Sequence, residues 1–102
     1  MGFSVRFTQQ ARDDLARLYD WLLQRAEGDF TVAERALQAI RDGVTVLEVA
    51  PLSCRKARSN NPFLRELVIG HVSSGYVLLS ELQDKQIVIV LAARQQREYD
   101  YY

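Results

Sequence analysis

The sequence predicts an α+β fold in the order β-α-α-β-β-β, with a helical hairpin packed on one face of a mostly antiparallel four-stranded sheet. Three observations support this. A short stretch of alternating apolar and polar residues opens the chain, two long segments with helical spacing follow, and three apolar runs separated by turn residues come last. Neither layer can bury its apolar stripe alone, so the two layers are expected to pack together.

Residues 3–7 alternate between apolar and polar side chains, which is typical of a short strand with one apolar face. Thr8 follows directly and is a candidate helix N-cap, because its hydroxyl can accept a free amide of the first turn. Gly28 and Asp29 are expected to end this first helix. Its apolar residues recur at helical spacing: Ala11, Leu15, Leu18, Tyr19, Leu22 and Leu23.

The second helix is predicted to open at Thr31, because Thr31 and Glu34 have the spacing of a capping box. Pro51 marks its end. Two long helices joined by a short turn form an αα-hairpin. The apolar stripe of this helix consists of Ala33, Ala36, Leu37, Ile40, Val44 and Leu47.

Residues 51–62 are rich in turn formers and are predicted to be a loop. The three apolar runs that follow, residues 64–69, 76–82 and 87–93, are predicted to be strands joined by hairpin turns. The third run is apolar throughout and rich in β-branched residues, which indicates an interior strand. Residues 94–102 are expected to form a flexible tail, and no linker divides residues 1–102, so we expect a single domain.

The overall charge is balanced, with 13 Lys and Arg against 13 Asp and Glu, so no direct binding of the chain to DNA is expected. Four basic residues nevertheless lie close together with no acid between them: Arg55, Lys56, Arg58 and Arg65. This cluster is a candidate contact for phosphates or for the acidic side chains of a partner. The alternative is that these residues form a solvated loop.

Other features exclude whole classes of function. Cys54 is the single cysteine, which rules out an internal disulfide and is typical of a protein from the reducing cytoplasm. The chain does not open with a charged region followed by an apolar stretch, so no signal peptide is predicted. It has no apolar run near the roughly 20 residues that span a bilayer. With one His and one Cys, we predict neither a metal site nor a cofactor.

The element order and several local sequences resemble the RelE/ParE toxin superfamily of type II toxin–antitoxin systems. The residues that carry the resemblance are Val5-Arg6-Phe7-Thr8 with Ala11, Asp14 and Leu15, then Leu64 to Ile69, Ser74 to Leu78, and Ile89 to Glu98. The resemblance implies a small toxin that a cognate antitoxin neutralises by wrapping around it, in a heterotetramer or a larger assembly.

The superfamily has two main activities, and the chemistry separates them. RelE-like toxins are ribosome-dependent mRNA endonucleases, which need a base, an acid and cations around the phosphate. Where the RelE pattern has two lysines and an arginine, this sequence has Val68, Gly70 and Val77. The remaining catalytic candidates are Arg97, Glu98 and Tyr99, with Tyr101 as an alternative source of the family's C-terminal tyrosine.

A second RNA-cleaving arrangement, which resembles that of YoeB, uses a histidine near the C-terminus, where this chain has Gln95. His71 lies at a turn and is expected to be a surface residue. The ParE-like branch, whose members poison DNA gyrase without catalysis, is therefore favoured. The alternatives are a RelE-like endonuclease and a degenerate member that retains only antitoxin binding.

Three residues are individual candidates for partner or target binding. Trp21 falls outside the apolar stripe of its helix, so it is either an interface residue or a helix-edge packer. Arg65 either contacts a partner or pairs with a nearby acid at the strand edge. Arg94 directly follows an interior strand and either binds a partner or anchors the tail through a salt bridge. An exposed sheet edge or the groove beside the helical hairpin can accept the antitoxin, which should be acidic if it covers residues 55–65.

Overall fold

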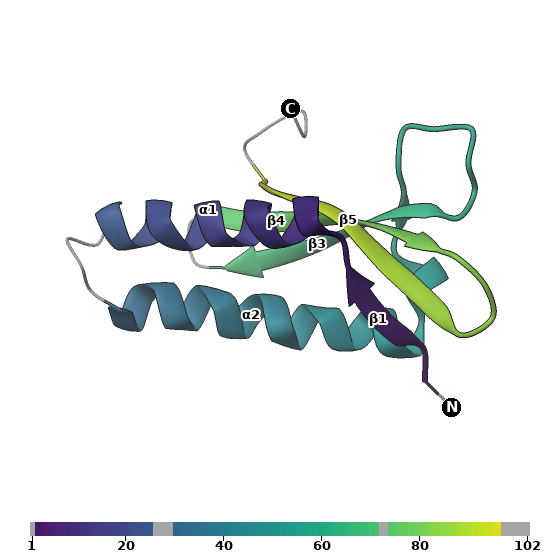
Figure 1. Cartoon of the computed structure of the whole chain (residues 1–102), viewed down its shortest axis with the longest axis horizontal. Coiled ribbons are helices and arrows are strands. Elements are labelled where there is room, and N and C mark those ends of the chain that lie inside the picture. The colour runs from purple at the N-terminus through teal and green to yellow at the C-terminus, as the bar shows by residue number, and fades with distance from the viewer. Residues whose placement is uncertain (1, 26–29, 72–73, 97–102) are drawn as a thin grey trace.

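The computed structural model describes residues 2–25, 30–71 and 74–96. In Figure 1, helices α1 (Gln9–Arg25) and α2 (Phe30–Val49) run alongside each other over one face of the strands. The strands are β1 (Ser4–Phe7), β2 (Arg55–Lys56), β3 (Leu64–His71), β4 (Ser74–Leu82) and β5 (Ile87–Gln95), and a short 3-10 helix (Pro51–Ser53) follows α2. The predicted α+β class is confirmed.

The sheet has five strands in the order β1-β5-β4-β3-β2, one more than predicted. The additional strand is β2, which lies inside the segment predicted to be a loop and consists of two charged residues, Arg55 and Lys56. So short a strand has no period-two pattern by which a sequence could reveal it. β1 pairs with β5 in parallel and the other neighbours are antiparallel, so β5 is an interior strand, as predicted.

The helix ends are largely where the sequence places them. The amide of Ala11 donates to Thr8 Oγ1 at 3.1 Å, which confirms Thr8 as the N-cap of α1. α2 ends at Val49, just before Pro51. It begins at Phe30, one residue before the predicted start, so Thr31 lies in the first turn and is not the N-cap that the capping box requires. Gly28 and Asp29, predicted to end α1, lie outside the described residues.

The hydrophobic core lies between the helices and the sheet. Gly43 of α2 lies directly against β3, since a Cβ atom added there would be 2.7 Å from Ile69 Cδ1. The close approach therefore needs a residue without a side chain. The buried core residues on both layers are Ala11, Leu18, Ala36, Ile40, Leu47, Leu67, Ile69, Tyr76, Leu78, Val88, Val90 and Ala93.

β5 extends through Gln95, so Arg94 and Gln95 belong to the sheet and not to a tail. This corrects the predicted start of the tail at residue 94. The strand continues because Arg94 and Gln95 still pair with Val77 and Tyr76 of β4. Residues 97–102 lie outside the described part of the chain.

Candidate partner-binding surfaces

The face of the sheet turned away from the helices, here called the outer face, brings together residues that are far apart in the sequence. Side chains alternate along a strand, and Leu67, Ile69 and Tyr76 point into the core. Their neighbours Val68 and Val77 therefore lie on the outer face, where Val68 pairs with Val77 and Val77 with Arg94. These three residues form one row across β3, β4 and β5, and Gly70 lies beside it on β3.

Arg94 is held by the sheet itself. Only 8% of the residue is exposed. Its Nη1 donates to the carbonyl of Gln95 at 3.1 Å, and its Nη2 lies 3.5 Å from Glu66 Oε2. The other carboxylate oxygen of Glu66 accepts from Arg55 Nε at 2.9 Å. Glu66 thus links β2 and β5 across the outer face, and Arg94 takes part in an ion pair, one of its two predicted roles.

The basic cluster does not form one continuous patch. Arg55 pairs with Glu66 and Lys56 with Arg65 in neighbouring register positions, so the side chains of Arg55 and Lys56 leave the strand on opposite faces. Arg58 lies in the loop after β2 and is exposed. The exposed cations of this cluster therefore surround the end of β2 rather than one face of the sheet.

Arg65 has a structural role. Its Nε donates to the carbonyl of Pro62 at 3.0 Å, and its Nη1 donates to the carbonyls of Leu52 and Cys54 at 3.0 and 3.1 Å. These bonds hold the 3-10 helix and the loop after β2 against the start of β3. The predicted alternative of an acid partner was wrong in its chemistry, because the partners found here are backbone carbonyls.

Cys54 is partly covered by these elements. Burial raises the pKa of its thiol, and the positive charge of Arg65 partly opposes that rise. A thiol with a raised pKa holds less of the reactive thiolate at neutral pH. The cysteine is therefore suited to packing rather than to nucleophilic chemistry.

Trp21 lies half-buried on α1, outside the hydrophobic core. The guanidinium carbon of Arg25 is 4.8 Å from the centre of its ring, a cation–π contact. Arg17, Trp21 and Arg25 are four residues apart, so they share one helix face. This face presents an aromatic side chain between two cations, which is the composition expected of a protein contact.

Asp14 has a structural role that was not predicted from the sequence. Its carboxylate is fully buried. Asp14 Oδ2 accepts the backbone amide of Ala93 at 2.9 Å, and Oδ1 accepts Gln10 Nε2 and Arg17 Nη2 at 3.0 and 2.8 Å. The sequence does indicate that Asp14 is buried, because it lies three residues after Ala11 and four before Leu18, on the apolar stripe of α1.

Asp14 and Thr8 form hydrogen bonds with the backbone of β5 along the edge that β1 does not cover. β1 ends at Phe7 opposite Val90, so β5 continues beyond its parallel neighbour. Thr8 Oγ1 donates to the carbonyl of Leu91 at 3.0 Å, and Asp14 accepts the amide of Ala93. The first turns of α1 thereby satisfy backbone groups that would otherwise be buried without partners.

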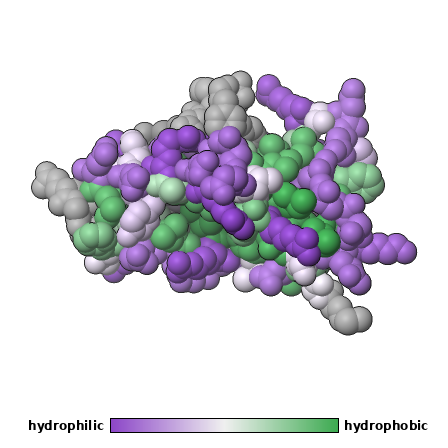
Figure 2. Space-filling view, in the orientation of Figure 1, coloured by the Kyte–Doolittle hydropathy of each residue, from purple (hydrophilic) through white to green (hydrophobic). Residues whose placement is uncertain are grey.

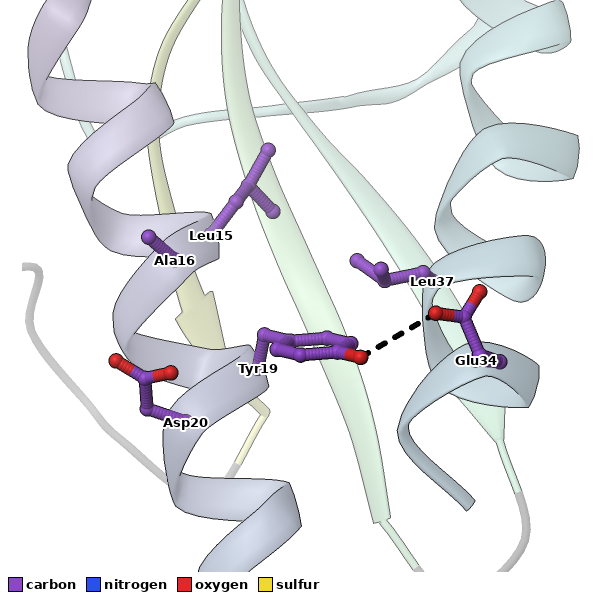
Figure 3. Close-up of a pocket in the computed structure, with 6 residues that line it drawn as sticks. All are labelled: Leu15, Ala16, Tyr19, Asp20, Glu34 and Leu37. Atoms are coloured by element: carbon purple, nitrogen blue, oxygen red, sulfur yellow. Dashed lines mark hydrogen bonds between the residues drawn. The ribbon is translucent and has the colours of Figure 1, made fainter. Parts of the chain in front are cut away.

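A groove of about 300 Å³ lies between the two helices, lined by Leu15, Ala16, Tyr19, Asp20, Glu34 and Leu37. Figure 3 shows Tyr19 reaching from α1 toward α2, where its hydroxyl donates to Glu34 Oε1 at 3.3 Å. Desolvation, and after it the Glu34 carboxylate, raises the pKa of Tyr19. Figure 2 shows some hydrophobic side chains between the two helices and a larger hydrophobic area over the strands, on the right of the view.

A second hollow, of about 290 Å³, lies where α2, the segment after it and β3 meet. It is lined by Val46, Ser53, Cys54, Arg55, Glu66, Leu67 and Val68. The hollow is mixed in character, with apolar walls from α2 and β3 and the Arg55–Glu66 ion pair at one side. Like the first, it is suited to receiving a side chain or a short segment of a partner.

Some predicted sites fall outside the part of the chain that the structure describes. Arg97, Glu98 and Tyr99 are among these residues. Within residues 2–25, 30–71 and 74–96, no group of three or more His, Cys, Asp or Glu side chains is placed to hold a metal ion. None of the helices in those ranges combines the length and apolar character needed to cross a membrane.

The fold is shared with a known toxin–antitoxin protein. The chain matches a solved structure described as the chromosomal ParDE TA system from P. aeruginosa, with a TM-score of 0.71 and 20% sequence identity. The match covers 91% of this chain and 95% of that one. This class of α+β fold is therefore shown by the structure, while the low identity carries nothing beyond the fold.

The family follows from the sequence match. The model of the ParE toxin of the type II toxin–antitoxin system, parDE, matches residues 5–99. The chain belongs to this ParE toxin family and is the toxin component of a type II system. The resemblance to the ParE-like branch is confirmed. No curated protein sequence is significantly similar to the chain.

Proposed function

We propose that this toxin acts by binding and poisoning DNA gyrase, without catalysing a reaction of its own, and that a cognate antitoxin neutralises it in the cytoplasm. The proposal is supported first by membership in the ParE toxin family. The observation that carries it further is the row of Val68, Val77 and Arg94 across the outer face.

RNA cleavage at this face would need cations and a proton-transferring group around the phosphate. Val68 and Val77 offer neither, and Gly70 beside them has no side chain. Arg94 is nearly buried, and its guanidinium already contacts Glu66 and the carbonyl of Gln95. The RelE-like alternative therefore lacks support from the three positions that would have to carry it.

For a toxin that works by binding, the exposed cations and aromatic side chains become the functional groups. We propose that Trp21, with Arg25 against its ring, contacts the target. Arg55, Lys56 and Arg58 are proposed to contact the antitoxin, as acidic segments complement such cations. Arg65 and Arg94 contribute by holding the loop and the outer face in place.

A supercoiling assay tests the target. Purified toxin is expected to inhibit the supercoiling of relaxed plasmid by gyrase and to accumulate cleaved DNA, and addition of its antitoxin should restore activity. The control is the toxin–antitoxin complex prepared beforehand. Unchanged supercoiling at a large molar excess of folded toxin would contradict the proposal, and mRNA cut at the ribosomal A site in the same cells would support the RelE-like alternative instead.

Trp21→Ala is expected to weaken inhibition of gyrase by about tenfold or more, because aromatic anchors at interfaces commonly contribute about 2 kcal/mol. The fold should survive, since Trp21 lies outside the core. Phe30→Ala is a matched control, because Phe30 is also an aromatic residue of the helical pair and is 63% exposed. The half-inhibitory toxin concentration is the measurement. Equal values for wild type and Trp21→Ala would remove Trp21 from the target contact.

A further inference from the structure

The buried carboxylate of Asp14 contacts two separate parts of the molecule. Its Oδ2 accepts the backbone amide of Ala93 in β5 at 2.9 Å. Its Oδ1 accepts Arg17 Nη2 at 2.8 Å, and Arg17 lies on the surface of α1. One carboxylate therefore connects the sheet to an exposed arginine.

The ion pair between Asp14 and Arg17 differs from an ordinary surface pair. Two exposed partners gain little from pairing, because both side chains lose freedom of movement when they meet. Here the side chain of Asp14 is 0% exposed and is already held by the amide of Ala93, whereas 61% of the Arg17 side chain is exposed. The guanidinium of Arg17 is thus fixed in position by a rigid partner while its side chain stays accessible.

Arg17 lies on the helix face that carries Trp21. Arg17, Trp21 and Arg25 follow one another at four-residue spacing, and the guanidinium of Arg25 lies against the ring of Trp21. A guanidinium has several N–H donors in a planar fork, and the bond to Asp14 uses one of its nitrogens. Such a fork can also donate to a planar anion from a partner, for which a carboxylate has the matching geometry.

The charges around this face favour a protein partner over nucleic acid. Asp13 and Asp20 are exposed on the same side of α1, four residues before Arg17 and three residues after it. Their two negative charges balance those of Arg17 and Arg25, so the face lacks the net positive charge by which proteins bind the DNA backbone. A single acidic side chain, met by a fixed arginine beside an aromatic ring, suits such a mixed surface better.

We propose that Arg17 binds an acidic side chain of gyrase, next to the contact made by Trp21, and that Asp14 is the positioning residue that holds the Arg17 guanidinium for this contact. The inference rests on the proposed poisoning of gyrase and specifies one of its contacts. Because Asp14 is also bonded to Ala93, the position of Arg17 is set by the sheet as well as by α1. A side chain that is held in place before binding loses less freedom when the partner arrives.

Arg17→Lys tests the contact with gyrase. Lysine keeps a positive charge beside Asp14 but has no planar fork, so half-inhibition of supercoiling should need about five to ten times more toxin. The urea midpoint should stay close to that of wild type, because the buried carboxylate retains a cationic partner. Arg12→Lys is the matched control, since Arg12 is exposed on another side of α1, and it should inhibit like wild type.

Asp14→Asn tests the positioning role. The amide oxygen of asparagine can still accept the backbone amide of Ala93, but the side chain lacks the charge that holds Arg17. Inhibition should weaken about fivefold, and adding Arg17→Lys should weaken it by at most about a further twofold, because both changes act on one contact. Losses that multiply in the double variant would overturn the positioning role.

NMR relaxation of the Nε–H group of Arg17 measures its order without gyrase. In the wild-type toxin this group should be markedly more ordered than that of Arg12, and in Asp14→Asn the two should be similar. The wild-type measurement decides the positioning role even if Asp14→Asn fails to fold. An Arg17 side chain as mobile as that of Arg12 in wild type would overturn it.

The remaining outcomes separate the inference from the function beneath it. Equal inhibition by wild type and Arg17→Lys would overturn the inference alone, whereas wild-type toxin that leaves supercoiling unchanged would overturn both. Calorimetry of toxin with gyrase in the absence of DNA identifies the group that Arg17 meets. Weaker binding of Arg17→Lys under these conditions supports a carboxylate of the protein, and an effect seen only with DNA present would identify phosphates and overturn the inference.

Discussion

Val77→Arg is expected to unfold the toxin rather than to give it ribonuclease activity. This change restores an arginine at the position where RNA-cleaving relatives have one, but Val77 is fully buried. It is also paired directly with Arg94, so the new charge would be placed beside an existing one. Burying an uncompensated charge costs several kcal/mol, and we expect the free energy of unfolding to fall by about 4 kcal/mol or more.

The matched control is Val68→Arg on the same row of the outer face. Val68 is 38% exposed and pairs with Val77, so an arginine there can extend its charged end into water. Its free energy of unfolding should stay within about 1 kcal/mol of wild type. Urea denaturation followed by circular dichroism measures both variants. A Val77→Arg protein with the urea midpoint of wild type would show that the outer face accepts a cation, and this would contradict the exclusion of RNA cleavage at that face.

Asp14→Ala is expected to lower the free energy of unfolding by about 2–4 kcal/mol. The carboxylate is fully buried and accepts the backbone amide of Ala93 at 2.9 Å. Its removal leaves that amide without its acceptor at the point where β1 no longer covers β5, and it also takes away the ion pair with Arg17. Because the contact joins α1 to β5, its removal is expected to weaken the packing of the helix layer onto the sheet.

Asp13→Ala is the control, because Asp13 is adjacent in sequence and carries the same charge. Its side chain is exposed, and Oδ1 accepts a hydrogen bond from Gln9 Nε2 at 2.9 Å on the helix surface. The expected change is within about 0.5 kcal/mol. Equal urea midpoints for the two variants would show that the buried contact with Ala93 contributes nothing beyond a surface carboxylate.

Local physics made most of the elements predictable. Thr8 caps α1 because its hydroxyl oxygen accepts a hydrogen bond from the amide of Ala11, three residues away. Pro51 follows the end of α2 because proline has no backbone N–H and cannot continue a helix. The interior position of β5 follows from its continuous apolar sequence. In each case the residues that decide the structure are neighbours in the chain, so their pattern can be read directly.

The structure differs from the sequence prediction where a residue's conformation depends on a contact with a residue distant in the sequence. β2 exists because Arg55 and Lys56 meet the start of β3, and two charged residues have no strand pattern of their own. Arg65 was expected to pair with an acid or to contact a partner, but its guanidinium donates hydrogen bonds to three backbone carbonyls. Asp14 depends on Ala93, 79 positions away. Such contacts are set by how the layers pack, not by local preference.

The sequence by itself determined the α+β class and the order of the helices and strands, apart from the short β2. It also indicated the resemblance to the ParE toxins that the family match confirmed. It also identified Val68, Gly70 and Val77 as positions without the expected charge. Only the tertiary structure decided that Val68 and Val77 adjoin Arg94 in one row, that Glu66 ties Arg94 to Arg55, and that a buried carboxylate joins α1 to β5. The physical reason is that periodicity and capping act over a few residues, whereas strand register and buried charge depend on residues that meet only when the chain folds.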